Sequence, residues 1–171
     1  MSDPIDPTSP TAPGACDLAA DVLVVGAGPA GAAAAVWLRR AGRSVIVIDK
    51  ASFPRDKCCG DGLTTLALRE LEPLGLRPEH VRNWQTVTAA WLRSPSGREV
   101  CLPMPSGGIF AATAPRRELD AALVRLALQA GADVREGHTL TALRQFDDHV
   151  DAEVTGPVSY THLTLPTIYS V

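Results

Sequence analysis

The chain has 171 residues, of which 46% are hydrophobic and 20% are charged, and this predicts one domain with a hydrophobic core. Its formal net charge of −3 at pH 7, with no basic stripe, argues against nucleic-acid binding. No apolar run approaches the roughly 20 residues that span a bilayer, and residues 1–20 contain no Lys or Arg, which argues against a secretory signal.

The chain begins with a segment unlike the rest. Residues 1–20 are rich in Pro, Ser, Thr and Asp and are predicted to form a disordered leader. The apolar run over 21–26 then predicts a buried parallel strand. Residues 29–41 are Ala-rich, end in basic residues and precede Gly42, which predicts a helix with a glycine cap. A second buried strand over 44–49 completes one βαβ unit.

The following part of the chain alternates short strands with two further helices. Leucines at helical spacing predict helices over 63–76 and 115–130. Short apolar runs between turn residues predict strands over 86–93, 99–102, 109–113, 132–136, 140–146 and 150–154. The predicted fold class is α/β: a three-layer, Rossmann-like domain with a parallel sheet and the start of an antiparallel sheet around 86–113.

The composition changes at residue 158. Residues 158–171 contain no charged residue but hold both tyrosines of the chain. One interpretation is an edge hairpin around Pro166, since Thr, Tyr, Val and Ile favour strands. The preferred interpretation is an artefact, because the string resembles translated sequencing-library adapter, and such a segment is left out of fold reasoning. The predicted organisation is therefore a leader over 1–20, one folded domain over 21–157 and an adapter-derived segment over 158–171.

A G-x-G-x-x-G motif over 26–31 lies directly between the first predicted strand and helix. Gly26 permits the tight turn, Gly28 lets the backbone approach a pyrophosphate, and Gly31 lets the helix pack closely. The free N–H groups of the helix start then face the phosphates. Asp49 ends the second strand, where its carboxylate can accept hydrogen bonds from ribose hydroxyls. These features predict a site for FAD or NAD; the alternative is a structural glycine turn with a solvated aspartate.

The loop after the second strand resembles one family of flavoproteins. In the FAD-dependent geranylgeranyl reductase family, within the p-hydroxybenzoate-hydroxylase-like group, this loop is close to Phe-Pro-Arg-x-Lys-x-Cys-Gly-x-Gly. The matching residues are Phe53, Pro54, Arg55, Lys57, Cys59, Gly60 and Gly62. Cys58 departs from the pattern, since the family often has Pro there. A second resemblance is the segment 116–120, which is similar to the family's Arg-x-x-Phe-Asp, with Leu119 in place of Phe.

This resemblance covers about residues 21–155, the N-terminal part of an FAD-binding domain; the family's second FAD motif, a Gly-Asp segment, is absent from the chain. It implies FAD as the cofactor, bound by Gly26, Gly28, Ala30, Gly31, Asp49, Cys59, Gly60, Gly62, Arg116 and Leu140. Arg116 would help to hold the flavin, the alternative being a surface charge paired with a nearby carboxylate. Cys59 would lie near the isoalloxazine ring as the candidate catalytic residue, where a thiol could tune the flavin or assist proton delivery. The alternative for Cys59 is a small buried residue in a tight loop.

The implied function is reduction of carbon–carbon double bonds in prenyl (geranylgeranyl) groups, with NAD(P)H or ferredoxin as the electron donor. The expected partners are a prenyl-type or other small apolar substrate and, peripherally, a membrane. Scattered His residues and four cysteines without a Cys-x-x-Cys pair argue against a metal site and for reduced thiols in the cytoplasm. Two alternatives stay open: a flavin-dependent monooxygenase or halogenase of the same fold group, and a stand-alone dinucleotide-binding module without catalysis. The 171-residue chain itself is expected to bind FAD weakly or not at all and to be inactive.

Overall fold

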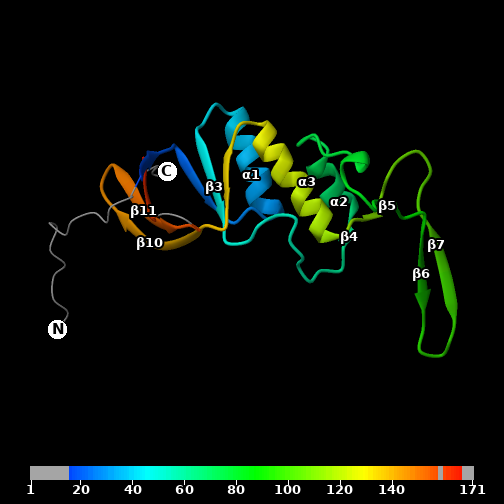
Figure 1. The fold of residues 1–171 in the computed structure, drawn as a ribbon. Coiled ribbons are helices and arrows are strands. Elements are labelled where there is room, and N and C mark those ends of the chain that lie inside the picture. Colours follow the sequence, from blue (N-terminus) through cyan, green and yellow to red (C-terminus); the bar gives the residue numbers. More distant parts are fainter. Residues whose placement is uncertain (1–15, 158–159, 167–171) are drawn as a thin grey trace.

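A computed structural model describes residues 16–157 and 160–166. Its helices are α1 (Pro29–Arg40), α2 (Thr65–Leu71) and α3 (Arg116–Gln129), with a short 3₁₀ helix over Pro78–His80. In Figure 1, α1 and α3 lie on one side of strand β3, and a second sheet lies on the other side. None of the helices in the described ranges is both long enough and apolar enough to cross a membrane.

The middle layer is a parallel sheet with the strand order β2-β3-β9. Its strands are β2 (Val22–Val25), β3 (Val45–Asp49) and β9 (Asp133–Glu136). All five residues of β3 are buried, because side chains alternate between the two faces of a strand and both faces are covered. Val45 and Val47 pack in the cluster formed with α1 and α3, whereas Ile46 and Ile48 pack against the second sheet. The predicted βαβ unit is confirmed.

The second sheet is mixed and has the order β1-β12-β11-β10. Its strands are β1 (Cys16–Ala19), β10 (Thr139–Gln145), β11 (His149–Thr155) and β12 (Tyr160–Pro166). Ala152, Val154 and Leu163 are each at most 1% exposed and pack with Ile46 and Ile48. The helices, the parallel sheet and this sheet form three layers, which confirms the predicted α/β class.

The structure adds a strand at each end of the predicted domain of residues 21–157, and the one before it corrects the predicted leader. Strand β1 lies inside the segment predicted as a disordered leader, and it pairs in parallel with β12. Its formation follows from packing, since Leu18 and Ala20 join the cluster around Ile48. Residues 1–15 lie outside the described part of the chain. The other end also forms a strand: β12 pairs on both edges, with β1 and β11. Strand pairing does not test where a segment comes from, so the adapter origin of 158–171 stays a prediction.

The remaining elements form the part of the molecule farthest from the second sheet (Figure 1). Short strands β4 (Gly62–Leu63), β8 (Ala112–Thr113) and β5 (Gln85–Thr86) make an antiparallel sheet, and β6 (Ala89–Arg93) pairs with β7 (Glu99–Pro103) as a hairpin. The strand predicted over 86–93 is thus divided in two, and only the end of 109–113 is a strand. Helix α2 ends at Leu71 and not at residue 76, because Pro73 has no N–H to continue it.

Candidate functional site

The glycine motif forms the turn from β2 into α1. Gly26 has a φ of +102°, a conformation that glycine adopts without steric cost. A Cβ at Gly31 would overlap the carbonyl oxygen of Gly26 and lie 3.1 Å from the Val24 side chain, so helix and strand pack closely only with glycine there. Pro29 occupies the first turn of α1, where its missing N–H costs no hydrogen bond. The N–H groups of the next two residues, Ala30 and Gly31, have no acceptor within the helix and can bind an anion, whereas the Ala32 N–H donates to the Gly28 carbonyl.

Asp49 joins this turn to the end of β3. The residue is buried, with 8% of its surface exposed. Oδ2 accepts a hydrogen bond from the Ala27 N–H at 2.8 Å, and Oδ1 accepts one from the Ala51 N–H at 2.9 Å. Each carboxylate oxygen has a second lone pair, so Asp49 can hold the turn and still accept a hydrogen bond from a ribose hydroxyl. The hydrogen bonds to Ala27 and Ala51 therefore do not prevent the predicted hydrogen bond from a ribose hydroxyl to Asp49.

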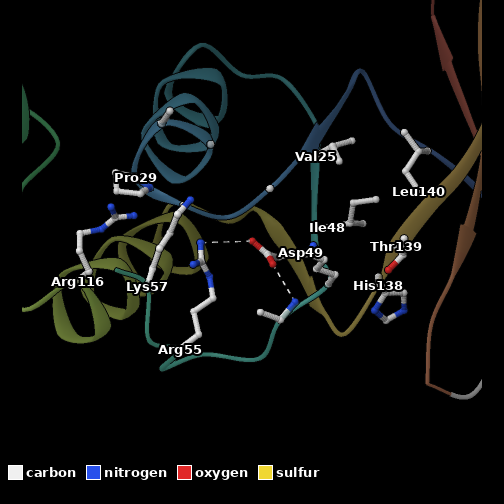
Figure 2. A pocket seen from close by; sticks show the side chains of 16 residues that line it. Val25, Pro29, Ile48, Asp49, Arg55, Lys57, Arg116, His138, Thr139 and Leu140 are labelled. Atoms are coloured by element: carbon white, nitrogen blue, oxygen red, sulfur yellow. Dashed lines mark hydrogen bonds and ion pairs between the residues drawn. The ribbon is translucent and has the colours of Figure 1, made fainter. Parts of the chain in front are cut away.

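An open cleft of about 880 Å³ lies over the glycine turn. In Figure 2, His138, Thr139 and Leu140 line one end of it, and Lys57 and Arg116 line the other. Its ionised lining comprises a single carboxylate, Asp49, and four cationic side chains: Lys50, Arg55, Lys57 and Arg116. A volume of this size suits a cofactor, and the excess of positive charge suits an anionic one, such as a dinucleotide with its diphosphate.

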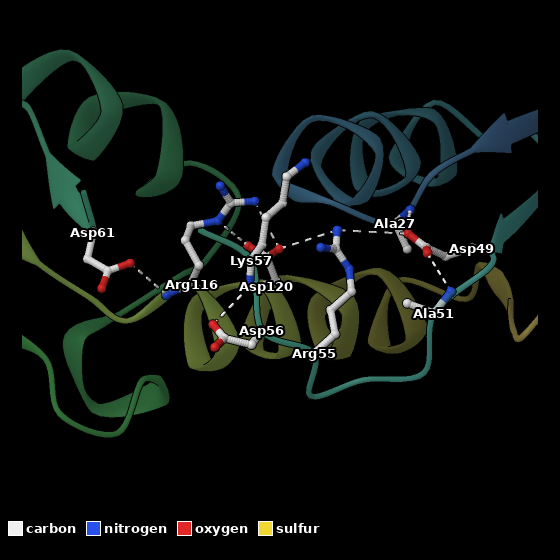
Figure 3. Close-up of polar contacts among 9 residues, drawn as sticks. All are labelled: Ala27, Asp49, Ala51, Arg55, Asp56, Lys57, Asp61, Arg116 and Asp120. Carbon is white, nitrogen blue, oxygen red and sulfur yellow. Dashed lines mark hydrogen bonds and ion pairs between the residues drawn. The ribbon is translucent and has the colours of Figure 1, made fainter. Parts of the chain in front are cut away.

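A buried ion network runs below the cleft and joins three segments (Figure 3). Asp120 on α3 is 0% exposed. Arg116 donates two hydrogen bonds to it, Nε to Oδ1 at 2.7 Å and Nη2 to Oδ2 at 3.0 Å. Hydrogen bonding to Asp120 is also the main reason why the pKa of Arg116 lies above its usual value. Arg55 from the loop after β3 lies between the two carboxylates, its Nη2 at 3.6 Å from Asp120 and 4.0 Å from Asp49.

Cys59 lies beside this network, in an exposed loop. The Asp61 carboxylate accepts a hydrogen bond from the backbone N–H of Arg116 at 3.1 Å, which fixes the loop to the start of α3. A hydrogen bond from the Asp61 backbone, with the nearby Arg116 guanidinium, lowers the pKa of the Cys59 thiol below its usual value. Cys59 is therefore not the small buried residue of the alternative interpretation, since its thiol is exposed; its catalytic role stays a prediction.

Not all predicted cofactor residues meet in the cleft. Seven of the ten line it: Gly26, Gly28, Ala30, Gly31, Asp49, Arg116 and Leu140. Cys59 and Gly62 instead line a neighbouring apolar pocket of about 400 Å³ between α1, α2 and α3. Gly60 lines neither cavity. Ala30 and Arg116 line both and so connect them. Whether these residues contact the cofactor stays a prediction.

The structure also adds cleft residues that sequence reasoning missed. Arg55, Lys57, His138 and Thr139 line the cleft. Arg55 and Lys57 belong to the loop motif that carries the family resemblance, so their spacing was the available signal. No sequence signal points to His138, because tertiary contacts bring it to the cleft. Its backbone N–H donates a hydrogen bond to the Asp49 carbonyl at 2.9 Å. Within the described residues, no three His, Cys, Asp or Glu side chains are grouped to hold a metal ion.

Known proteins similar to this chain include both reductases and monooxygenases. A menaquinone reductase from Mycolicibacterium smegmatis is 46% identical over 131 residues, which cover 69% of this chain and 29% of the relative. A 12-dehydrotetracycline 5-monooxygenase/anhydrotetracycline 6-monooxygenase from Streptomyces rimosus is 32% identical over 144 residues, which cover 80% of this chain and 27% of the relative. The chain therefore spans less than a third of the length of these curated relatives.

Solved structures and family membership agree with the geometry. A geranylgeranyl bacteriochlorophyll reductase-like protein from Thermoplasma acidophilum superposes with a TM-score of 0.75, over 88% of this chain and 38% of that one, at 24% identity. This likeness shows a shared fold. Residues 19–171 match a family described as the FAD binding domain. With the glycine turn, Asp49 and the cationic cleft in place, the chain belongs to the FAD binding domain family.

Proposed function

We propose that this chain is the N-terminal cofactor-binding part of a flavin-dependent reductase that saturates carbon–carbon double bonds in the prenyl chain of a lipid. The observation that carries the proposal is the 46% identity to a menaquinone reductase, together with a cationic cleft suited to the diphosphate of FAD. Menaquinone carries a prenyl chain, so a prenylated quinone is the substrate class to test first. Such a lipid also implies peripheral contact with a membrane.

In this proposal the chain's residues bind and orient the cofactor. The N–H groups at the start of α1 and the cations of the cleft bind the diphosphate, while Asp49 accepts from the ribose. Bound FAD supplies hydride chemistry that no side chain can perform. Cys59 is the candidate proton donor, because donors around it lower its thiol pKa and an acid with a pKa nearer the working pH transfers a proton more effectively.

A monooxygenase is the second candidate, favoured by the 32% identity to the tetracycline monooxygenase. It would use the same cleft and the same Asp49. The two candidates differ in what reduced flavin would react with. In the reductase it would be a carbon–carbon double bond, and in the monooxygenase it would be molecular oxygen. The electron donor is proposed to be NAD(P)H or ferredoxin for the reductase.

The deciding experiment begins with the gene. We would sequence it from source DNA across the codon for Pro157, express the full product and confirm bound flavin by absorbance. The purified protein would then be incubated without oxygen with a prenylated menaquinone and either NAD(P)H or reduced ferredoxin, and the lipid analysed by mass spectrometry. If the mass of the lipid rises by two hydrogens and stays so after the quinone is reoxidised in air, prenyl reduction is supported. If air reverses this increase in mass, the reduction took place on the quinone ring. If the mass rises by one oxygen when the reaction is run in air, the monooxygenase is supported. Nucleotide binding without turnover of any substrate would favour the stand-alone module.

A further inference from the structure

Two cysteines follow one another in the loop after β3. Cys58 and Cys59 are both free and exposed, and residues 55–61 belong to no helix or strand. Cys101 on the hairpin is exposed as well, but no other cysteine adjoins it in the sequence. Among the described residues, only this loop therefore holds two adjacent exposed thiols.

The surroundings of the two thiols differ. Cys59 lines the apolar pocket, whereas Cys58 lines neither this pocket nor the cleft. The Asp61 backbone and the Arg116 guanidinium lower the pKa of Cys59, and the thiolate is the form that oxidants attack. An exposed thiol that favours the thiolate and has a second thiol beside it is the arrangement typical of redox-sensitive cysteines.

The loop has room to form a bond between the two sulfurs. A Cβ placed on the next residue, Gly60, would meet nothing within 4 Å, so the backbone after the pair is not packed against other residues. The Cα atoms of adjacent residues are about 3.8 Å apart, which is less than the roughly 4.4–6.8 Å usual across a disulfide. A bridge between Cys58 and Cys59 is therefore strained, and strained, exposed disulfides are readily reduced again.

We propose that Cys58 and Cys59 form a peroxide-sensitive dithiol, in which Cys58 is the resolving thiol that keeps oxidation of Cys59 reversible. Without a neighbouring thiol, a sulfenic acid is oxidised further to a sulfinic acid, which thiol reductants do not reverse. Cys58 thus protects Cys59, the candidate proton donor under the proposed function. Cys58 is also the residue at which this loop departs from the family pattern.

The oxidation takes two steps. The Cys59 sulfur first attacks hydrogen peroxide: the O–O bond breaks, an S–O bond forms, and the other oxygen takes up a proton and leaves as water. Sulfur is thereby oxidised to a sulfenic acid and the peroxide is reduced. The Cys58 sulfur then attacks the sulfur of Cys59, so that an S–S bond forms, the S–O bond breaks, and water leaves with the proton of the Cys58 thiol. A thiol reductant returns two electrons and two protons and restores both thiols.

The test treats the full-length, flavin-bound protein with hydrogen peroxide and then alkylates the remaining thiols with iodoacetamide. Trypsin cleaves after Lys57 and Arg69, so both cysteines lie in one peptide, residues 58–69, and Cys101 lies in another. We expect the 58–69 peptide to lose the mass of two hydrogens and to escape alkylation, and dithiothreitol to restore two alkylatable thiols. The Cys101 peptide should be oxidised more slowly. Because the result is read from peptide masses, it stands or fails separately from the proposed prenyl reduction.

The deciding variant is Cys58→Ala, with Cys101→Ala as its matched control. In Cys58→Ala the sulfenic acid of Cys59 has no partner, so dimedone should trap it, and excess peroxide should add two oxygens that dithiothreitol does not remove. Cys58→Ser, which is closer in size, should behave in the same way, and Cys101→Ala should behave like the wild type. Equal dimedone labelling of Cys59 in the wild type and in both Cys58 variants would overturn the proposal. A wild-type peptide that gains oxygens without first losing two hydrogens would do so too.

Discussion

Strand β3 and the hairpin of β6 and β7 are both largely apolar, but only β3 is covered. Every residue of β3 is buried, whereas every residue of β7 is exposed. In the hairpin, Trp91 is 69% and Leu92 is 58% exposed, and Val100 and Leu102 are each nearly half exposed. Figure 1 shows the reason: β3 lies between the helices and the second sheet, and the hairpin extends away from both.

The cleft and the hairpin therefore differ in how far the described residues cover them. The turn and cleft around Asp49 are assembled from elements that bury one another, so their geometry follows from contacts within the described residues. Within residues 16–157 and 160–166, no element covers the apolar side chains of the hairpin, and apolar surface of this kind is typical of interaction sites.

The largest effect is expected at Gly31. Replacing it with Ala puts a Cβ on the carbonyl oxygen of Gly26, which should destabilise the protein by about 3 kcal/mol or more and abolish dinucleotide binding. Gly97→Ala in the hairpin turn is the matched control: φ is +86° there and nothing lies within 4 Å of the new Cβ, so only about 1 kcal/mol of backbone strain is expected. Urea unfolding of both variants measures the difference. Similar losses at the two positions would contradict the contrast.

A smaller effect distinguishes the two apolar surfaces directly. Ile48 is 0% exposed, so Ile48→Ala should cost about 2–5 kcal/mol through lost burial and a cavity. Leu92→Ala, on the hairpin, should change the free energy of unfolding by less than about 0.5 kcal/mol. If Leu92→Ala proves as costly as Ile48→Ala, the hairpin is covered in solution, and a dependence of its melting temperature on protein concentration would show that a second copy covers it.

The sequence was sufficient for the elements whose signal is local. The run over residues 44–49 indicated a strand buried on both faces, and the glycine turn located the cleft. The strands predicted over 140–146 and 150–154 correspond to β10 and β11. The helix predicted over 63–76 was too long because leucine spacing outweighed Pro73, although a single proline is enough to end a helix.

Contacts between distant segments were beyond the sequence. The pairing of Leu18 with Leu163 in β1 and β12 depends on a sheet that closes over Ile48, and no local pattern encodes that partner. The network of Arg55, Asp120 and Asp49 joins a loop, a helix and a strand, and no local pattern predicts that these three charges lie together. Cys59 was predicted to lie near the isoalloxazine ring; the loop fixed by Asp61 places it in the pocket next to the cleft, and its contact with the flavin stays a prediction.

The smallest and most local prediction compares two exposed thiols, Cys59 at the site and Cys101 on the hairpin. The Asp61 backbone hydrogen bond and the Arg116 guanidinium lower the pKa of Cys59, so its thiolate, the nucleophilic form, persists to lower pH than in an ordinary exposed thiol. The rate of alkylation of Cys59 by iodoacetamide should therefore have a midpoint shifted to lower pH, followed by mass spectrometry of its peptide in a Cys58→Ser background. Arg116→Gln should move that midpoint upward and leave the rate at Cys101 unchanged, because only the site thiol loses a neighbouring cation. A midpoint that does not move in Arg116→Gln would mean that the Arg116 guanidinium does not lower the pKa of Cys59, and would leave the Asp61 backbone as the cause.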